Sequence, residues 1–205
     1  MKTIWDFWAN KYDKLWVQKY SLTPTRNEII KIIKDEKQPN TILDMGCGTG
    51  QLTRELSDIC PSADIVGVDY SSEMISIAKE NAKNAGKNKL SYFNDSVDTF
   101  IVKEKVDIVT CSHSFPYYKN KKDAFKFFSE SLVDGGLLLL AQASENSFYD
   151  KLCMLGVKTT TTKAKYLSIK ELKDLSKDLF ITENIIKIKE KWYMPTIIVM
   201  KMRKK

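Results

Sequence analysis

A run of glycines follows an acidic residue in the N-terminal half of this 205-residue chain. The run from Ile42 to Gly50 contains Asp44 and then glycines at positions 46, 48 and 50. Glycine lets a ligand approach the backbone closely, and the start of a following helix offers unpaired N–H groups. A carboxylate at this point would repel a pyrophosphate but suits a positively charged ligand. We therefore expect a ligand site at this turn.

Two further acidic residues lie where apolar runs end. Asp69 ends the run Asp64–Asp69, and Asp95 follows the run Leu90–Phe93. A carboxylate can accept two hydrogen bonds from a diol, and ligands of open α/β sheets bind at the carboxyl ends of the strands. Each acid could instead cap the helix that follows it, so both interpretations stay open.

His113 is the single histidine of the chain, directly after the apolar run Val106–Ser112. It could act as a general base toward a hydroxyl or an amine, or it could be a partly buried loop residue. The four cysteines form no CxxC pair. With one histidine they supply no structural zinc set, so we expect no metal and reduced thiols.

Apolar runs alternate with helical patterns through the middle of the chain. This alternation predicts a doubly wound α/β sheet whose central strands are parallel and covered on both faces. A turn is predicted at Asp134–Gly136, and a hairpin with a tight connection at Glu190 near the C-terminus. Strands are expected at 41–45, 64–69, 90–93, 106–112, 137–143, 180–189 and 191–202, and helices at 52–59, 71–84, 123–133 and 169–179.

Two helices are expected before the first strand. Aromatic residues recur at helical spacing between Trp5 and Tyr20, and this first helix should break before Pro24. A second helix should open at Pro24 and end at Pro39.

The segment Leu43–Gly50 resembles the first motif of the class I S-adenosylmethionine-dependent methyltransferases. Its G-x-G-x-G spacing departs from the G-x-G-x-x-G of dinucleotide-binding folds, which disfavours a nicotinamide oxidoreductase. The resemblance covers about residues 41–143. It implies a Rossmann-like seven-stranded sheet in the order 3-2-1-4-5-7-6, with strand 7 antiparallel. We expect a single domain overall, with a helical cap at 1–40 and the methyltransferase domain at 41–205.

The resemblance also implies a cofactor site for S-adenosylmethionine, with S-adenosylhomocysteine as the product. Asp69 would bind both ribose hydroxyls, Tyr70 and Met74 would pack against the adenine, and Asp95 would accept from its amino group. Tyr12, followed by Asp13, resembles an N-terminal tyrosine that closes over the cofactor. The full expected set is Tyr12, Asp44, Gly46, Cys47, Gly48, Gly50, Asp69, Tyr70, Met74, Asp95, Ser96 and Ser112.

A small organic acceptor is the expected substrate, because aromatic residues cluster in the cap and after the fourth strand. His113 is the candidate catalytic base. The acceptor atom (O, N, S or C) is not determined by the sequence. The expected wall residues are Trp8, Trp16, Tyr20, Phe115, Tyr117, Tyr118 and Phe148.

The charge distribution leaves two alternatives open. The formal net charge is +7, but residues 41–144 are net acidic and the two ends are basic. The basic ends could serve an RNA methyltransferase, although thirty of the 33 basic residues are lysine and nucleic-acid readers favour arginine. The stretch Cys111–Tyr117 also lacks the Asn/Asp-Pro-Pro-Tyr-type motif of many base-amino methylases. The other alternative is a non-catalytic S-adenosylmethionine-binding protein.

Location and assembly follow from weaker signals. No apolar run approaches the ~18 residues of a membrane span, and the first residues have no uninterrupted apolar centre of a signal peptide. We therefore expect a cytoplasmic protein without membrane contact. The oligomeric state is not determined.

Overall fold

The structure of the chain is a computed structural model. It describes residues 9, 12–13, 18–87, 90–144, 164–191 and 194–205. The sheet has seven strands in the order β3-β2-β1-β4-β5-β7-β6. β7 pairs antiparallel with both β5 and β6, whereas the other pairs are parallel. The fold and strand order expected from the sequence are confirmed.

The parallel strands come from buried apolar runs, except for the edge strand β3, of which only Tyr92 is buried. They are β1 (Thr41–Met45), β2 (Asp64–Asp69), β3 (Ser91–Asn94), β4 (Val106–Ser112) and β5 (Leu132–Ala143), and the antiparallel hairpin is β6 (Phe180–Ile188) with β7 (Ile197–Lys204). Alternate residues of β5 lie in two different core clusters, with Leu138 and Leu140 on one face and Leu137 and Leu139 on the other. The central sheet is therefore covered on both faces.

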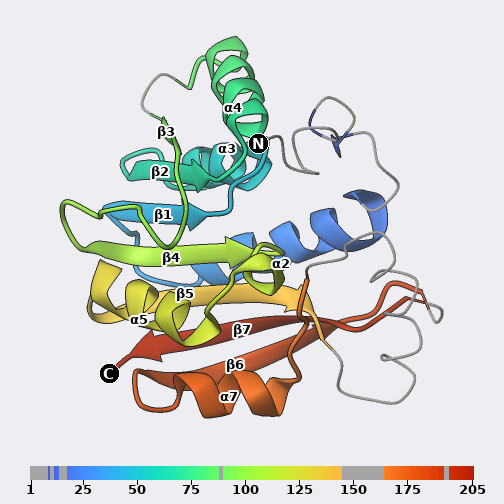
Figure 1. Cartoon of the computed structure of the whole chain (residues 1–205). Helices are drawn as coiled ribbons and strands as arrows, with labels where there is room; N and C mark the ends of the chain where they lie inside the picture. Colours follow the sequence, from blue (N-terminus) through green and yellow to red (C-terminus); the bar gives the residue numbers. More distant parts are fainter. Residues whose placement is uncertain (1–8, 10–11, 14–17, 88–89, 145–163, 192–193) are drawn as a thin grey trace.

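Helices supply the two covering layers (Figure 1). On one face α5 (Lys121–Ser131) and α7 (Ile169–Ser176) bury Phe125, Phe128 and Leu172. On the other face α2 (Thr23–Lys34) and α3 (Gln51–Ile59) contribute isoleucine and leucine side chains to the second cluster. α4 (Ser72–Asn84) packs against β2 and β3, and its start is capped by the Ser71 hydroxyl. Because β1 to β5 pair in parallel, their carboxyl ends lie at one common edge of the sheet.

The N-terminal residues are described in part. Gln18–Leu22 forms a single π-helical turn, η1, that continues into α2. Most of the first helix expected between Trp5 and Tyr20 lies outside the described residues. α2 packs into the same core as the sheet, with Ile29 and Ile33 fully buried. The division into a cap at 1–40 and a domain at 41–205 stays a prediction.

Two local predictions were wrong. The turn expected at Asp134–Gly136 lies inside β5, where the register with β4 shifts between Val106 and Ile108 and Gly135 takes a left-handed φ of 70°. β5 pairs with β4 before this irregularity, at Leu132, and after it, from Leu137 on, so the intervening residues stay within the strand. The second hairpin strand begins at Ile197 rather than Lys191, so Pro195 lies in the connection, where its missing N–H costs no ladder bond.

Among the helices of the described residues, none has the length and apolar character needed to cross a membrane.

Candidate functional site

The glycine-rich turn joins the end of β1 to α3 and is fastened to β2. The backbone N–H groups of Gly46 and Cys47 both donate to the Val68 carbonyl, over 2.7 and 3.0 Å. Gly46, Gly48 and Gly50 all have left-handed φ values, of 80°, 56° and 72°. Residues with a Cβ rarely adopt such values, which accounts for the alternating glycines.

The three glycines differ in what surrounds them. A Cβ on Gly46 would lie 2.2 Å from the Ser114 Cβ, and a Cβ on Gly50 would lie 2.7 Å from the Tyr92 hydroxyl. Both are therefore required by packing within the protein. A Cβ on Gly48 would have as its nearest neighbour a Tyr12 ring carbon at 4.0 Å. Gly48 is the position in the turn where a ligand could approach the backbone.

Asp69, at the end of β2, braces this turn. Its Oδ2 accepts from the Gly48 N–H over 2.9 Å, and its Oδ1 accepts from the Ser71 N–H over 2.9 Å. One carboxylate oxygen of Asp69 therefore supports the start of α4, as the helix-capping alternative predicted, while the other binds the glycine-rich turn. Asp95 donates its backbone N–H to the Asp69 carbonyl over 3.0 Å. Asp69 and Asp95 therefore lie next to each other at the carboxyl ends of β2 and β3.

The Asp95 carboxylate is engaged locally. Its Oδ1 accepts from the Ser96 N–H over 2.7 Å and from the Thr99 hydroxyl. The Ser96 hydroxyl also contacts Thr99. These bonds close a turn after β3. The structure describes every residue between β3 and β4 and has no helix there, so the alternative that Asp95 caps a helix was wrong, and the contact with an adenine amino group stays a prediction.

Asp44 is a buried acid on β1. Its Oδ2 accepts from the Thr53 hydroxyl over 2.7 Å, and its Oδ1 accepts from the Thr110 hydroxyl over 2.8 Å. Burial raises the pKa of this carboxyl to about 6, against the lowering effect of the two hydroxyls. Among the described residues Asp44 forms no ion pair. A buried carboxylate of this kind favours a positively charged ligand, because the positive charge would lower its pKa toward the ordinary value.

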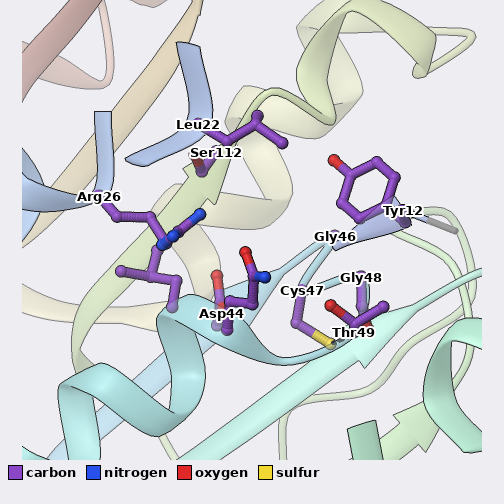
Figure 2. Close-up of a pocket in the computed structure, with 11 residues that line it drawn as sticks. Tyr12, Leu22, Arg26, Asp44, Gly46, Cys47, Gly48, Thr49 and Ser112 are labelled. Atoms are coloured by element: carbon purple, nitrogen blue, oxygen red, sulfur yellow. Dashed lines mark hydrogen bonds between the residues drawn. The ribbon is translucent and has the colours of Figure 1, made fainter. Parts of the chain in front are cut away.

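Asp44, Gly48 and Ser112 line one small cavity at the carboxyl edge of the sheet (Figure 2). Its volume is about 50 Å³, well below the ~300–1,000 Å³ of ordinary ligand sites. A nucleoside-sized ligand would need the surrounding side chains to move apart. The lining residues are Tyr12, Leu22, Arg26, Asp44, Gly46, Cys47, Gly48, Thr49, Gln51, Leu52 and Ser112.

Tyr12 and Asp13 bring the N-terminal segment onto the turn. Asp13 Oδ1 accepts from the Thr49 hydroxyl over 2.7 Å, and the Tyr12 ring lies beside Gly48. Burial, with added repulsion from Asp69 and Asp13, raises the pKa of the Tyr12 phenol. Tyr12 is therefore neutral and forms one wall of the cavity, which fits the expectation that it closes over a ligand.

The loop after β4 carries His113. This residue has a φ of 60°, its N–H donates to the Ala141 carbonyl over 2.7 Å, and its Nε2 lies 3.0 Å from the Thr25 hydroxyl. That hydroxyl donates to the Ser21 carbonyl, so it accepts from His113 and places the ring proton on Nε2. Burial, followed by the Arg26 charge, lowers the pKa of His113 to about 4. The ring is neutral at pH 7, with Nδ1 as its basic nitrogen.

The aromatic wall predicted for a substrate is dispersed. The prediction was wrong for Phe115, which is fully buried and packs against Phe125 and Phe128. Tyr117 is half-buried, with its hydroxyl 3.4 Å from that of Tyr166. Tyr118 turns its hydroxyl toward the Met45 carbonyl. Half-buried Tyr20 lies between the Lys19 and Lys191 ammonium groups, while Trp8, Trp16 and Phe148 lie outside the described residues.

The residues expected around an adenine are split between surface and core. The Tyr70 side chain is 67 % exposed, whereas Met74 is 3 % exposed. Cys47 packs beside a small cluster that contains Tyr92, and burial raises the pKa of its thiol well above the ordinary value. The ring contacts of Tyr70 and Met74 stay predictions.

Several site residues were missed by sequence reasoning. Thr110 stands opposite Asp44 in the β1–β4 register, so aligning the two predicted strands could have found it. Arg26 lines the cavity, but its guanidinium pairs with Glu55 over 3.1 Å and with Gln18 and Thr23. No local pattern marked Arg26, because its partners come from three different elements. The described residues hold no cluster of three His, Cys, Asp or Glu side chains that could bind a metal.

Comparison with known proteins agrees with this geometry. Residues 42–136 match the family model of a methyltransferase domain. The chain is 26 % identical over 118 residues to malonyl-[acyl-carrier protein] O-methyltransferase 2 of Ilyobacter polytropus, covering 58 % of this chain and 45 % of that protein. It is 30 % identical over 103 residues to the putative methyltransferase 235L of Invertebrate iridescent virus 6, covering 50 % and 37 %. The chain spans less than half the length of these relatives.

Solved structures share the fold. The structure of a putative methyltransferase in complex with the Trm112 methyltransferase activator of Haloferax volcanii matches with a TM-score of 0.82 at 16 % identity, covering 100 % of this chain and 99 % of that one. The N-methyltransferase NodS of Bradyrhizobium japonicum, in complex with S-adenosylhomocysteine, matches with a TM-score of 0.75 at 13 % identity, covering 92 % and 91 %. Residues 42–136 are therefore similar to a methyltransferase domain, and the chain shares its fold with solved methyltransferase structures.

Proposed function

We propose that this chain transfers a methyl group from S-adenosylmethionine to a small organic acceptor and releases S-adenosylhomocysteine. The observation that carries the proposal is the open space at Gly48 between two carboxylates, Asp44 and Asp69. Bound S-adenosylmethionine would supply an activated methyl group on a sulfonium. The residues present fit this cofactor, since it combines a diol with positive charge.

The proposal gives each side chain a role. Asp69 would accept from the ribose hydroxyls at the end of β2, and Asp44 would face the cationic part of the cofactor. Tyr12 would cover the bound molecule and exclude water. His113 would accept a proton at Nδ1 from the acceptor, if the acceptor needs a base. The rest of the rate enhancement would come from holding the nucleophile of the acceptor in line with the methyl group.

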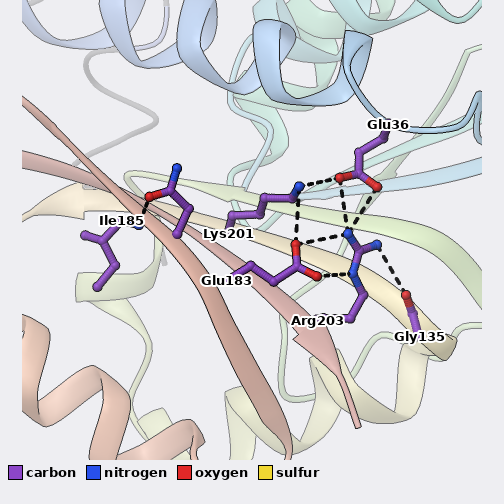
Figure 3. A network of polar contacts seen from close by, with 7 residues as sticks. Glu36, Gly135, Glu183, Ile185, Lys201 and Arg203 are labelled. Atoms are coloured by element: carbon purple, nitrogen blue, oxygen red, sulfur yellow. Dashed lines mark hydrogen bonds and ion pairs between the residues drawn. The ribbon is translucent and has the colours of Figure 1, made fainter.

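The structure gives less support to the alternative of an RNA methyltransferase. The basic C-terminal residues belong to β7, and acidic side chains pair with them: Arg203 and Lys201 contact both Glu36 and Glu183 (Figure 3), and Lys204 contacts Asp134. These cations are built into the sheet rather than presented on a free tail. A small-molecule partner and a cytoplasmic location stay predictions.

Calorimetric titration tests the cofactor first. S-Adenosylmethionine and S-adenosylhomocysteine should bind, and NAD should not; the reverse pattern would contradict the proposal. A screen of carboxylic acids, amines, thiols and phenols, read out by S-adenosylhomocysteine release, then tests turnover. Cofactor binding without turnover on any acceptor would favour a non-catalytic protein. Turnover on RNA that falls steeply with salt would favour the RNA alternative.

A further inference from the structure

Lys121, the first residue of α5, is a buried cation held by backbone carbonyls. Its side chain is 9 % exposed, and Nζ donates to the carbonyls of Phe115, Pro116 and Tyr118 over 2.8, 2.8 and 2.7 Å. An ammonium has three N–H donors, so all three are used. Nζ also lies 5.3 Å from the centre of the Phe115 ring.

This placement runs against two local preferences. A positive charge in the first turn of a helix opposes the helix dipole, and a buried lysine usually has a carboxylate partner. Among the described residues, Lys121 pairs with no carboxylate. The three carbonyls come from the short 3-10 helix η2 (Phe115–Tyr117) and the residue after it. The cation is therefore compensated by the loop alone, and it fixes that loop in return.

The loop that Lys121 holds is packed against the glycine-rich turn. Ser114 Oγ donates to the Met45 carbonyl over 3.0 Å, and Ser114 occupies the space beside Gly46. Tyr118, whose carbonyl Lys121 holds, donates its hydroxyl to the same Met45 carbonyl over 3.3 Å. Ser112, at the start of the loop, lines the cavity. A shift of η2 would therefore move the support of the turn that faces the ligand.

We propose that Lys121 is a positioning residue of the methyl-transfer site: its ammonium group anchors the loop Ser112–Tyr118 and thereby holds the glycine-rich turn in its ligand-binding geometry. This inference rests on the proposed function, because it concerns the same cofactor site. Lys121 does not line the cavity and acts through Tyr118 and Ser114.

The first test compares Lys121→Met with Lys122→Met. Methionine keeps the length of the side chain but has no donor, and Lys122 is an exposed neighbour in the same helical turn. Amide hydrogen exchange at Tyr117 and Tyr118, whose N–H groups bond to Ser114 and Phe115, reports the loop without any ligand. We expect at least tenfold faster exchange at both amides in Lys121→Met and no change in Lys122→Met. Calorimetry should show S-adenosylhomocysteine binding at least tenfold weaker in Lys121→Met alone.

A pH profile on the wild type keeps the proposal testable if Lys121→Met does not fold. Burial lowers the pKa of Lys121 to about 8, so the ammonium loses its third donor as the pH rises above this value. The titratable groups facing it are Cys111 and Lys165, and the pKa of Cys111 is raised to about 11 by burial. The Tyr117 and Tyr118 amide resonances of the wild type should shift with an inflection near pH 8. Where the variant folds, the affinity for S-adenosylhomocysteine should weaken at least threefold more in the wild type than in Lys121→Met between pH 7 and 9.5.

Three outcomes would overturn the inference. Exchange at Tyr117 and Tyr118 that is the same in both variants, or wild-type amide resonances at these positions that do not respond when the Lys121 ammonium titrates, would show that Lys121 does not anchor the loop. Faster exchange with unchanged S-adenosylhomocysteine affinity would make Lys121 a purely structural residue. A wild-type chain that binds no S-adenosylhomocysteine would instead contradict the proposed function, and the role of Lys121 with it.

Discussion

Asp69 is the residue whose role is most sharply testable, because its two carboxylate oxygens serve two different backbone groups. One oxygen holds the Gly48 N–H and the other holds the Ser71 N–H. A ribose diol would compete for the oxygen that faces the turn. Under the proposed function, Asp69 would bind the ribose while still supporting the start of α4.

Replacing Asp69 by alanine should weaken S-adenosylmethionine binding by about 1.5–3 kcal/mol, the usual scale for a hydrogen bond to a charged group. Calorimetric titration measures this directly. Asp64→Ala is the matched control, since Asp64 is an exposed acid at the opposite end of the same strand. Equal affinities in the two variants would remove Asp69 from the cofactor site.

The raised pKa of Asp44 predicts that the affinity for S-adenosylmethionine depends on pH. Its folded pKa of about 6 lies above the ordinary 3.8, so Asp44 contributes stability that is present below pH 3.8 and is lost as the pH rises through 6. The ionised form is the one that attracts a cation. S-Adenosylmethionine affinity should therefore fall as the pH is lowered from 7 to 5, and S-adenosylhomocysteine, which lacks the sulfonium charge, should lose less.

Asp44→Asn controls for other titrating groups. Its S-adenosylmethionine affinity at pH 7 should resemble that of the wild type at pH 5 and should change little between these values. Titration calorimetry at four pH values measures both proteins. A variant that keeps the full pH dependence of the wild type would show that another group is responsible.

His113 is the candidate base, and its test separates proton transfer from pocket shape. A working general base typically contributes about 100- to 10,000-fold to the rate, so His113→Ala should lower kcat by this order at pH 7. Cofactor affinity should change little, since His113 bonds to Thr25 and Ala141 rather than to the turn. Steady-state kinetics on the acceptor found in the screen measure the effect. If His113→Ala keeps most of the wild-type kcat across the whole pH range, His113 is not the general base, and positioning of the acceptor accounts for the rate enhancement.

At the scale of elements, the strand–turn–helix unit β1–α3 contains glycines with different functions. Gly46 and Gly50 leave room for Ser114 and Tyr92, whereas the space beside Gly48 is open. Under the proposed function, the motif would combine a packing requirement with a binding requirement. Alanine substitutions should separate the two.

Gly48→Ala should cost about 1–2 kcal/mol of folding free energy for its positive φ, and it should weaken S-adenosylhomocysteine binding at least tenfold. Gly46→Ala has the same φ cost plus about 1–3 kcal/mol of overpacking against Ser114, so it should be clearly less stable. Denaturant unfolding and calorimetry together measure both effects. Normal ligand binding by Gly48→Ala would mean that the ligand does not approach this turn.

At the scale of the whole molecule, a charge network joins α2 to the C-terminal hairpin. Glu36 follows α2, Glu183 lies on β6, and Lys201 and Arg203 lie on β7 (Figure 3). Burial alone would raise the pKa of Glu36, but hydrogen bonds from Lys201 and Arg203 outweigh it and lower the pKa. The hydrogen bond from Arg203 lowers the pKa of Glu183. Both acids thus contribute stability above their ordinary pKa, and this contribution is lost as the pH falls.

Glu36→Gln should lower the free energy of unfolding by about 1 kcal/mol at pH 7, because its side chain is 19 % exposed and contacts two cations. The loss should shrink at high salt and below pH 4. Glu130→Gln breaks the exposed Lys126–Glu130 pair and should change stability by less than about 0.5 kcal/mol. Urea unfolding compares the three proteins. Equal stability of Glu36→Gln and the wild type would show that the network adds nothing.

The sequence by itself determined strands β1, β2 and β4, the glycine-rich turn and the acids of the candidate site. The bounds predicted for β1, β2 and β4 agree with the structure to the residue, because a strand buried on both faces is a continuous apolar run that ends at a polar residue or a glycine. Asp44, Asp69 and Asp95 could be placed for the same reason, since they mark where those runs end. These are properties of neighbouring residues, and neighbouring residues are what a sequence pattern contains.

Only the tertiary structure decided which of these residues have open space beside them. Gly46 and Gly48 are equivalent in the sequence, yet Ser114, which approaches from 68 positions away, fills the space beside one of them. Phe115 was assigned to a pocket wall and lies in the core because α5 folds over it. Arg203 belongs to no free basic tail because Glu36 and Glu183 reach it across the sheet. Such contacts join distant segments, so they are fixed by packing and are absent from any local pattern.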